Sequence, residues 1–131
     1  MSTIKNKIVH QVFASTLSFD EYCTRTKENK EIMKNILKNM YKLSILAAWE
    51  NSILFSNHRG ANKCVLSLLG GFSFENPIDI IAQAINVNKN LIIESGLDVY
   101  IVCFGDDSFV QVQKIIAKTV IETSGSIIDA R

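Results

Sequence analysis

Apolar residues recur with helical spacing between residues 28 and 55, and this pattern predicts a long amphipathic helix. Its expected buried stripe consists of Ile32, Ile36, Met40, Leu43, Ala47 and Leu54. Two continuous apolar runs, residues 63–69 and 97–104, are typical of central strands buried on both faces of a parallel sheet. Residues 8–14 have the β-branched and aromatic content of another short strand.

Glycine, asparagine and proline mark the boundaries between these elements. Asn76 and Pro77 are expected to open a second helix as its N-cap and first residue, and Gly96 to end that helix after a bend at residues 86–90. Residues 105–108 form a predicted turn before a last helix that ends at Gly125, and residues 126–131 are either a short edge strand or a tail. The order β-α-β-α-β-α favours a three-layer α/β/α fold with a mostly parallel sheet, in one domain spanning residues 1–131.

The composition is that of a soluble globular protein and gives no sign of nucleic acid or membrane as a partner. The chain has 131 residues, of which 47% are hydrophobic and 21% charged, as in folded globular proteins. The formal net charge of +1 gives no pull toward nucleic acid. No apolar run approaches the length of a membrane span, so we expect a soluble, cytoplasmic protein.

The cysteines and histidines give little sign of metal or thiol chemistry. Cys23, Cys64 and Cys103 are odd in number and include no CxxC pair, so neither a disulfide framework nor a metal site is expected. A catalytic thiol would need a base, and His10 and His58 are the only histidines. We interpret His10 as a strand histidine and His58 as a solvated turn residue.

The strongest chemical signal is the loop after the first apolar run. Ligands of open parallel sheets bind beyond the carboxyl ends of the strands. Gly70 and Gly71 allow close backbone approach to a ligand, and the following amides lead into a helix N-terminus, which favours an anion such as a diphosphate. The same loop is also compatible with a plain strand-to-helix turn, because it matches neither GxGxxG nor a Walker motif.

Aromatic and acidic side chains surround this loop. Phe72, Phe74 and Phe104 either form a wall against a sugar or base or fold back onto the sheet edge. Three carboxylates are the weak catalytic candidates, since they could hold ribose hydroxyls or act as a base; capping and solvation are the alternative roles. These are Glu75, Asp106 and Asp107.

Residues 65–77, with the sequence VLSLLGGFSFENP, resemble the strand, ligand loop and helix start of macro domains, one branch of which has a loop of the form LTLLGGGxFGN. Residues 97–104 resemble the last core strand of that fold, and residues 8–15 the strand before its long central helix. The resemblance implies binding of ADP-ribose by residues 70–76, with Phe104 near the adenine. Its predicted ligand-binding residues are Gly70, Gly71, Phe72, Ser73, Phe74, Asn76 and Phe104.

The chain also departs from that family. Phe72 and Glu75 stand where the branch has glycines, and the usual N-terminal strands have no counterpart in the first residues. The resemblance therefore implies a module that binds ADP-ribose, a related nucleotide sugar or an ADP-ribosylated protein, without efficient catalysis and without a cofactor. A scaffold protein with a filled loop and an ADP-ribosyl hydrolase remain as alternatives. An unprotected sheet edge tends to find a partner, so a homodimer is expected.

Overall fold

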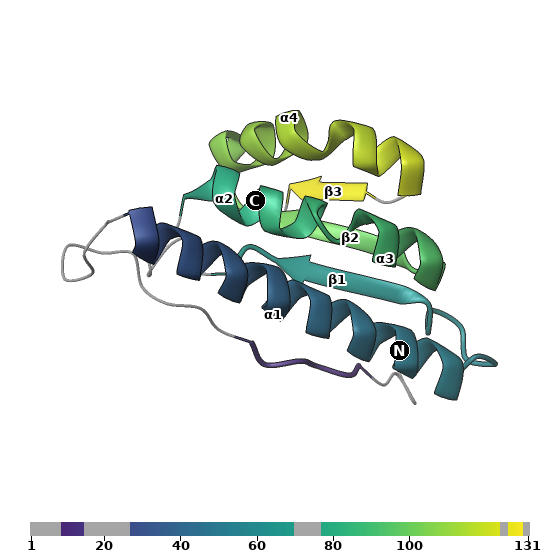
Figure 1. Cartoon of the computed structure of the whole chain (residues 1–131). Coiled ribbons are helices and arrows are strands. Elements are labelled where there is room, and N and C mark those ends of the chain that lie inside the picture. The colour runs from purple at the N-terminus through teal and green to yellow at the C-terminus, as the bar shows by residue number, and fades with distance from the viewer. Residues whose placement is uncertain (1–8, 15–26, 70–76, 124–125, 130–131) are drawn as a thin grey trace.

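The computed structural model describes residues 9–14, 27–69, 77–123 and 126–129. It confirms a mixed α/β chain with a parallel sheet (Figure 1). In chain order its elements are α1 (Lys27–Leu54), β1 (Lys63–Ser67), α2 (Ile78–Asn86), α3 (Lys89–Ser95), β2 (Asp98–Cys103), α4 (Asp106–Thr123) and β3 (Ser126–Asp129).

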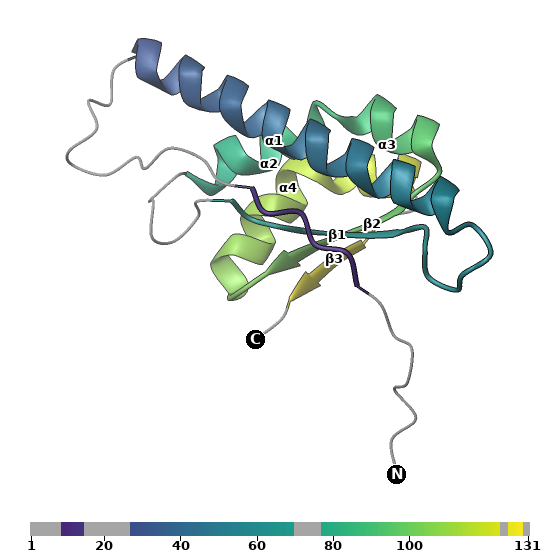
Figure 2. The same ribbon diagram turned by 90° about the horizontal axis from the view of Figure 1, so that it is seen from below.

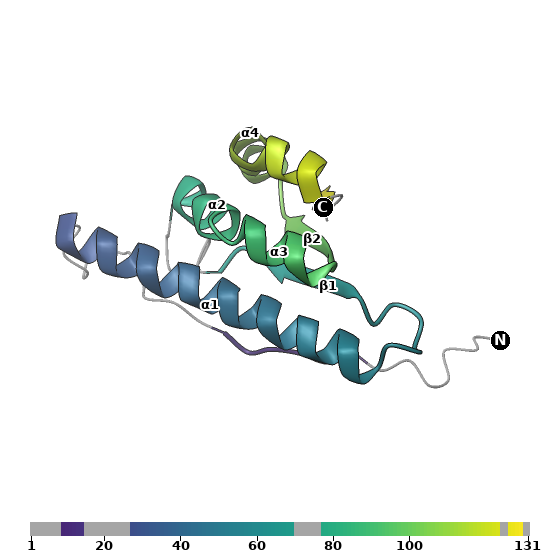
Figure 3. The same cartoon turned by 45° about the vertical axis from the view of Figure 1, so that its right-hand side comes forward.

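The three strands lie side by side in the order β1-β2-β3, and both pairings are parallel. Lys63 is opposite Asp98 in the first pair, and Tyr100 is opposite Ser126 in the second. Each parallel neighbour is reached through helices, α2 and α3 in the first crossover and α4 in the second. Right-handed crossovers between consecutive neighbours place these helices on one face of the sheet (Figure 3).

Burial along the strands agrees with this one-sided arrangement. Leu66 is 4% exposed and faces the helices, whereas its neighbour Val65 is 65% exposed on the opposite face. β1 alternates exposed and buried residues along its whole length, and β2 alternates half-buried and buried ones. The prediction that these strands are buried on both faces was therefore wrong, and within the described residues one helical layer covers the sheet instead of the expected two.

The core lies between the sheet and the helices. From α1 it receives Met33, Leu37, Tyr41 and Ile45, spaced by four residues. The predicted stripe was one position out of phase, because both sides of this helix carry apolar residues: Ile32 and Leu43 are half-exposed. The central helix α2 contacts both α1 and α4, and five of its nine residues are buried.

The predicted bend at residues 86–90 separates α2 from α3 and has a clear cause. The buried Asn88 amide donates hydrogen bonds to the carbonyl oxygens of Ala84 (3.0 Å) and Lys38 (3.2 Å). The first bond satisfies a carbonyl at the end of α2, and the second ties the bend to α1. Gly96 then ends α3 with φ +68°, a left-handed conformation that favours glycine.

Two other predicted boundaries change. The prediction of a short strand at residues 8–14 was wrong, because the described residues 9–14 pair with no strand, although they run along the outer side of β1 in the same direction (Figure 2). Helix α4 begins at Asp106, inside the predicted turn, while residues 126–129 form the edge strand that was one of two expectations.

The one-sided burial predicts effects of very different size at two adjacent residues of β1. Leu66→Ala should lower the free energy of unfolding by about 2–4 kcal/mol, because it leaves a cavity in the core. Val65→Thr, which keeps the shape and the strand propensity, should change it by less than about 0.5 kcal/mol. Urea unfolding followed by circular dichroism compares them, and equal losses would contradict the open face.

Candidate functional site

The carboxyl edge of the sheet gathers the ends of several elements (Figure 1). β1 ends here and leads through Leu69 to the glycine loop, and α2 starts here just after Pro77. Phe104 and Gly105 join the end of β2 to the start of α4 at the same edge. The predicted loop residues Gly70, Gly71, Phe72, Ser73, Phe74, Glu75 and Asn76 lie outside the described residues, so their roles stay predictions.

The buried Tyr41 side chain fixes the strand end that precedes the loop. Its hydroxyl donates a hydrogen bond to the Ser67 carbonyl oxygen (2.7 Å) and accepts one from the Leu69 amide (2.8 Å). Burial raises the pKa of this phenol well above its ordinary value, so the hydroxyl stays protonated and can make both bonds. Sequence reasoning missed Tyr41, because it lies 26 residues before Ser67 and its only signal was a tyrosine within an apolar helix face.

The start of α2 differs by one residue from the prediction. Pro77 is the N-cap, with extended backbone angles of φ −60° and ψ 134°, and its carbonyl oxygen accepts a hydrogen bond from the Ile81 amide (3.1 Å). Asn76 was predicted as the cap with Pro77 inside the helix. The remaining first-turn amides have the orientation that suits an anion at a helix N-terminus.

The turn after β2 carries Phe104, which alone among the predicted site aromatics belongs to the described residues. Phe104 is 54% exposed. Gly105 has φ +95°, which favours glycine, and the Ser108 hydroxyl reaches back to the carbonyl oxygens of Phe104 (2.9 Å) and Gly105 (3.1 Å). These two bonds hold the backbone directly after Phe104 in the turn, while the Phe104 side chain stays exposed.

The electrostatics of the edge combine two opposing contributions. The N-termini of α2 and α4 lie there, and each brings partial positive charge from its helix dipole (Figure 1). Carboxylates occupy the first turn of both helices: Asp79 in α2 and the exposed Asp107 in α4. Because these charges repel phosphate, the edge should bind a diphosphate less tightly than helix N-termini alone would.

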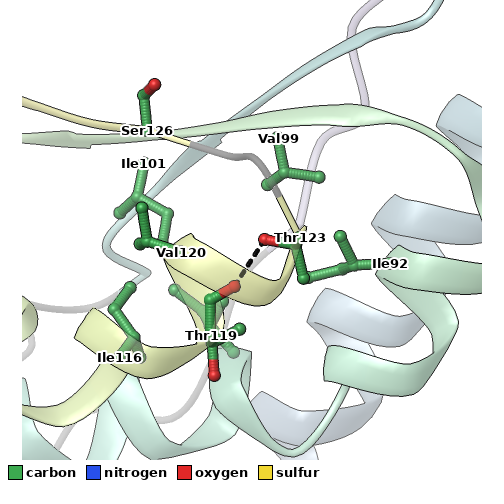
Figure 4. A pocket seen from close by; sticks show the side chains of 9 residues that line it. Ile92, Val99, Ile101, Ile116, Thr119, Val120, Thr123 and Ser126 are labelled. Carbon is green, nitrogen blue, oxygen red and sulfur yellow. Dashed lines mark hydrogen bonds between the residues drawn. The ribbon is translucent and has the colours of Figure 1, made fainter.

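A small hollow lies near the other end of the sheet, away from this edge (Figure 4). Its volume is about 20 Å³, room for roughly one water molecule. Aliphatic side chains such as Ile92, Val99 and Ile116 line most of it, and Thr123 there donates to the Thr119 carbonyl oxygen (2.7 Å). It is a gap in core packing and too small for an organic ligand.

The described cysteines and histidines are placed for packing. Cys64 and Cys103 are both buried. The His10 ring contacts Phe55 edge-on, with centroids 5.2 Å apart, and His58 contacts the same ring at 5.6 Å. Within residues 9–14, 27–69, 77–123 and 126–129 no group of acidic, histidine and cysteine side chains could hold a metal ion.

Comparisons with known proteins return no relative. No protein-family model, curated protein or solved structure matches the chain. Among the described helices, none combines the length and the apolar character needed to cross a membrane.

The double hydrogen bond of Tyr41 can be tested by removing one oxygen atom. Tyr41→Phe should lower the free energy of unfolding by about 1–3 kcal/mol, since the Ser67 carbonyl and the Leu69 amide lose their partner in a partly buried place. Tyr100→Phe, on the half-exposed face of β2, is the matched control and should cost much less. Equal stabilities of the Tyr41→Phe variant and the native chain in chemical unfolding would rule out the bond.

The burial of Cys64 predicts slow thiol chemistry. Desolvation raises the pKa of this thiol from 9.0 to about 11, so at pH 8 very little thiolate is present in the folded state. In a Cys23→Ser background, a disulfide reagent at pH 8 should label the folded chain at least about fifty times more slowly than the urea-unfolded chain. The Cys64 thiol also holds its proton more tightly in the folded chain than in the unfolded chain. Its contribution to the free energy of unfolding is therefore complete below pH 9 and is lost as the pH rises toward 11. Labelling at equal rates in both states would contradict the buried thiol.

Proposed function

We propose that the chain is a binding module for ADP-ribose or a related nucleotide sugar, with the ligand at the carboxyl edge of the parallel sheet. The observation that carries the proposal is the convergence at this edge of the β1 end, the α2 start and the exposed Phe104. The glycine loop 70–76 connects the first two of these along the chain. Ligands of parallel α/β sheets are bound in this position.

The parts of such a ligand have counterparts along the edge. A diphosphate suits the amides at the start of α2 and in the preceding loop. An adenine ring suits the exposed face of Phe104, since bases stack on aromatic side chains. The resemblance of residues 65–77 to the macro-domain loop supports the same assignment.

Binding is favoured over turnover because of the carboxylates. Asp79 and Asp107 lie in the first turns of α2 and α4, where they stabilise the helix dipoles. That structural role accounts for their position without a catalytic one. The same charges weaken the hold on a diphosphate, so we expect affinity in the micromolar range or weaker.

Calorimetry with ADP-ribose tests the proposal. The native chain should release heat on binding, and Phe104→Ala should weaken the affinity about tenfold by removing the stacking surface. Leu54→Ala is the matched control, because this exposed side chain lies at the end of α1, away from the site, and its loss should leave the affinity unchanged. Absence of heat at millimolar ADP-ribose would contradict the proposal.

Phe72→Gly separates this proposal from a scaffold with a filled loop. If Phe72 fills the loop, its removal opens the site and raises the affinity for ADP-ribose. If the loop already holds ligand, the same change leaves the affinity similar or lowers it. We expect the second result.

A further inference from the structure

A groove runs between α4 and the outer edge of the sheet. Its described walls are four residues of α4 and one of β3, and its volume is about 290 Å³. The lining residues are Phe109, Gln113, Ala117, Val120 and Ile127. β3 is the last strand in the sheet order, so among the described strands only β2 pairs with it (Figure 1).

The helical wall of this groove is a regular stripe. Residues 109, 113, 117 and 120 are spaced by four, four and three residues, so they lie on one side of α4. The core side of the same helix is formed by other residues, with Val112 and Ile116 fully buried. Ala117 is exposed near the centre of the stripe, and so small a side chain allows the backbone of a second helix to come close.

We propose that the groove is a homodimer interface, in which a second copy of this chain adds its own β3 and α4 across a two-fold axis. α4 and β3 run side by side in opposite directions at this margin (Figure 1). A two-fold axis perpendicular to the sheet would set β3 antiparallel to its copy and α4 antiparallel to its copy. One symmetry operation therefore pairs the open strand edge and covers the apolar stripe together, which is the self-complementarity of an isologous interface.

The small size of this surface predicts a dimer of low affinity. From residue 109 to residue 120 the stripe is about 16 Å long, and four strand residues span about 13 Å. The depth of the surface is that of one helix on one sheet, about 20 Å. The area given by this depth and the length of the stripe is well below the roughly 800 Å² per partner of standard interfaces. The net charge of +1 opposes association only weakly. We therefore expect a dimer that dissociates at micromolar concentrations.

Sedimentation equilibrium on the full chain between about 5 and 500 μM tests the interface. The native chain should pass from monomer to dimer over this range. Ala117→Arg should weaken the association at least tenfold, because it places two charged side chains near the axis. Gln111→Arg is the matched control: it adds the same charge to an exposed position of the same helix but on the other side, and should leave the dimer unchanged.

Two further measurements keep the test decisive. Thermal unfolding of Ala117→Arg at low concentration should match that of the native monomer, since the changed side chain is exposed. Gln113→Leu should tighten the dimer severalfold by extending the apolar stripe. A native chain that stays monomeric at 500 μM, or a dimer that persists unchanged in Ala117→Arg, overturns the proposal, as does equal weakening by Gln111→Arg.

Discussion

The hydroxyl group of Tyr41 holds together the two parts of the chain on which the candidate site depends. It lies in the core and is satisfied by the backbone on both sides of Leu68, through the Ser67 carbonyl and the Leu69 amide. A buried phenol is tolerated only when its polar end has partners, so α1 must lie across the end of β1 at one angle and depth. The direction in which the chain leaves the sheet toward the glycine loop is fixed by this contact.

The one-sided sheet follows from the topology, and it explains where the proposed ligand site and the proposed dimer groove lie. Consecutive parallel strands joined by right-handed crossovers put α2, α3 and α4 on the same face. The strand ends and helix starts then meet at one edge, where the proposed ligand binds. Among the described strands β3 is the last in the sheet, and only β2 pairs with it. The groove of the proposed dimer lies between this strand and α4. Site and interface lie at different margins of the sheet, so each proposal can fail without the other.

Much of this architecture could be predicted from the sequence, because its signals are local. The apolar runs predicted the strands β1 and β2, although only β2 is central among the described strands. Gly96 predicted the end of α3, and the parallel order predicted the edge at which Phe104 lies. Which side of an element is buried could not be predicted, because it depends on distant packing. Ile32 and Met33 are both apolar neighbours, yet only Met33 faces the core. A continuous apolar run such as residues 63–69 likewise fits a strand covered on one face or on two. The hydrogen bonds of Tyr41 join residues that lie too far apart in the sequence for any motif to predict them.

Amide chemical shifts test directly whether the carboxyl edge of the sheet binds a nucleotide sugar, as proposed. In a titration with ADP-ribose followed by two-dimensional ¹H–¹⁵N NMR, the amides of Leu69, Ile78 and Gly105 should shift together as the site fills. The amides of Lys63, Asp98 and Ser126, at the opposite ends of the same strands, should stay in place. Shifts centred on that opposite end, or no shifts at millimolar ligand, would contradict the account.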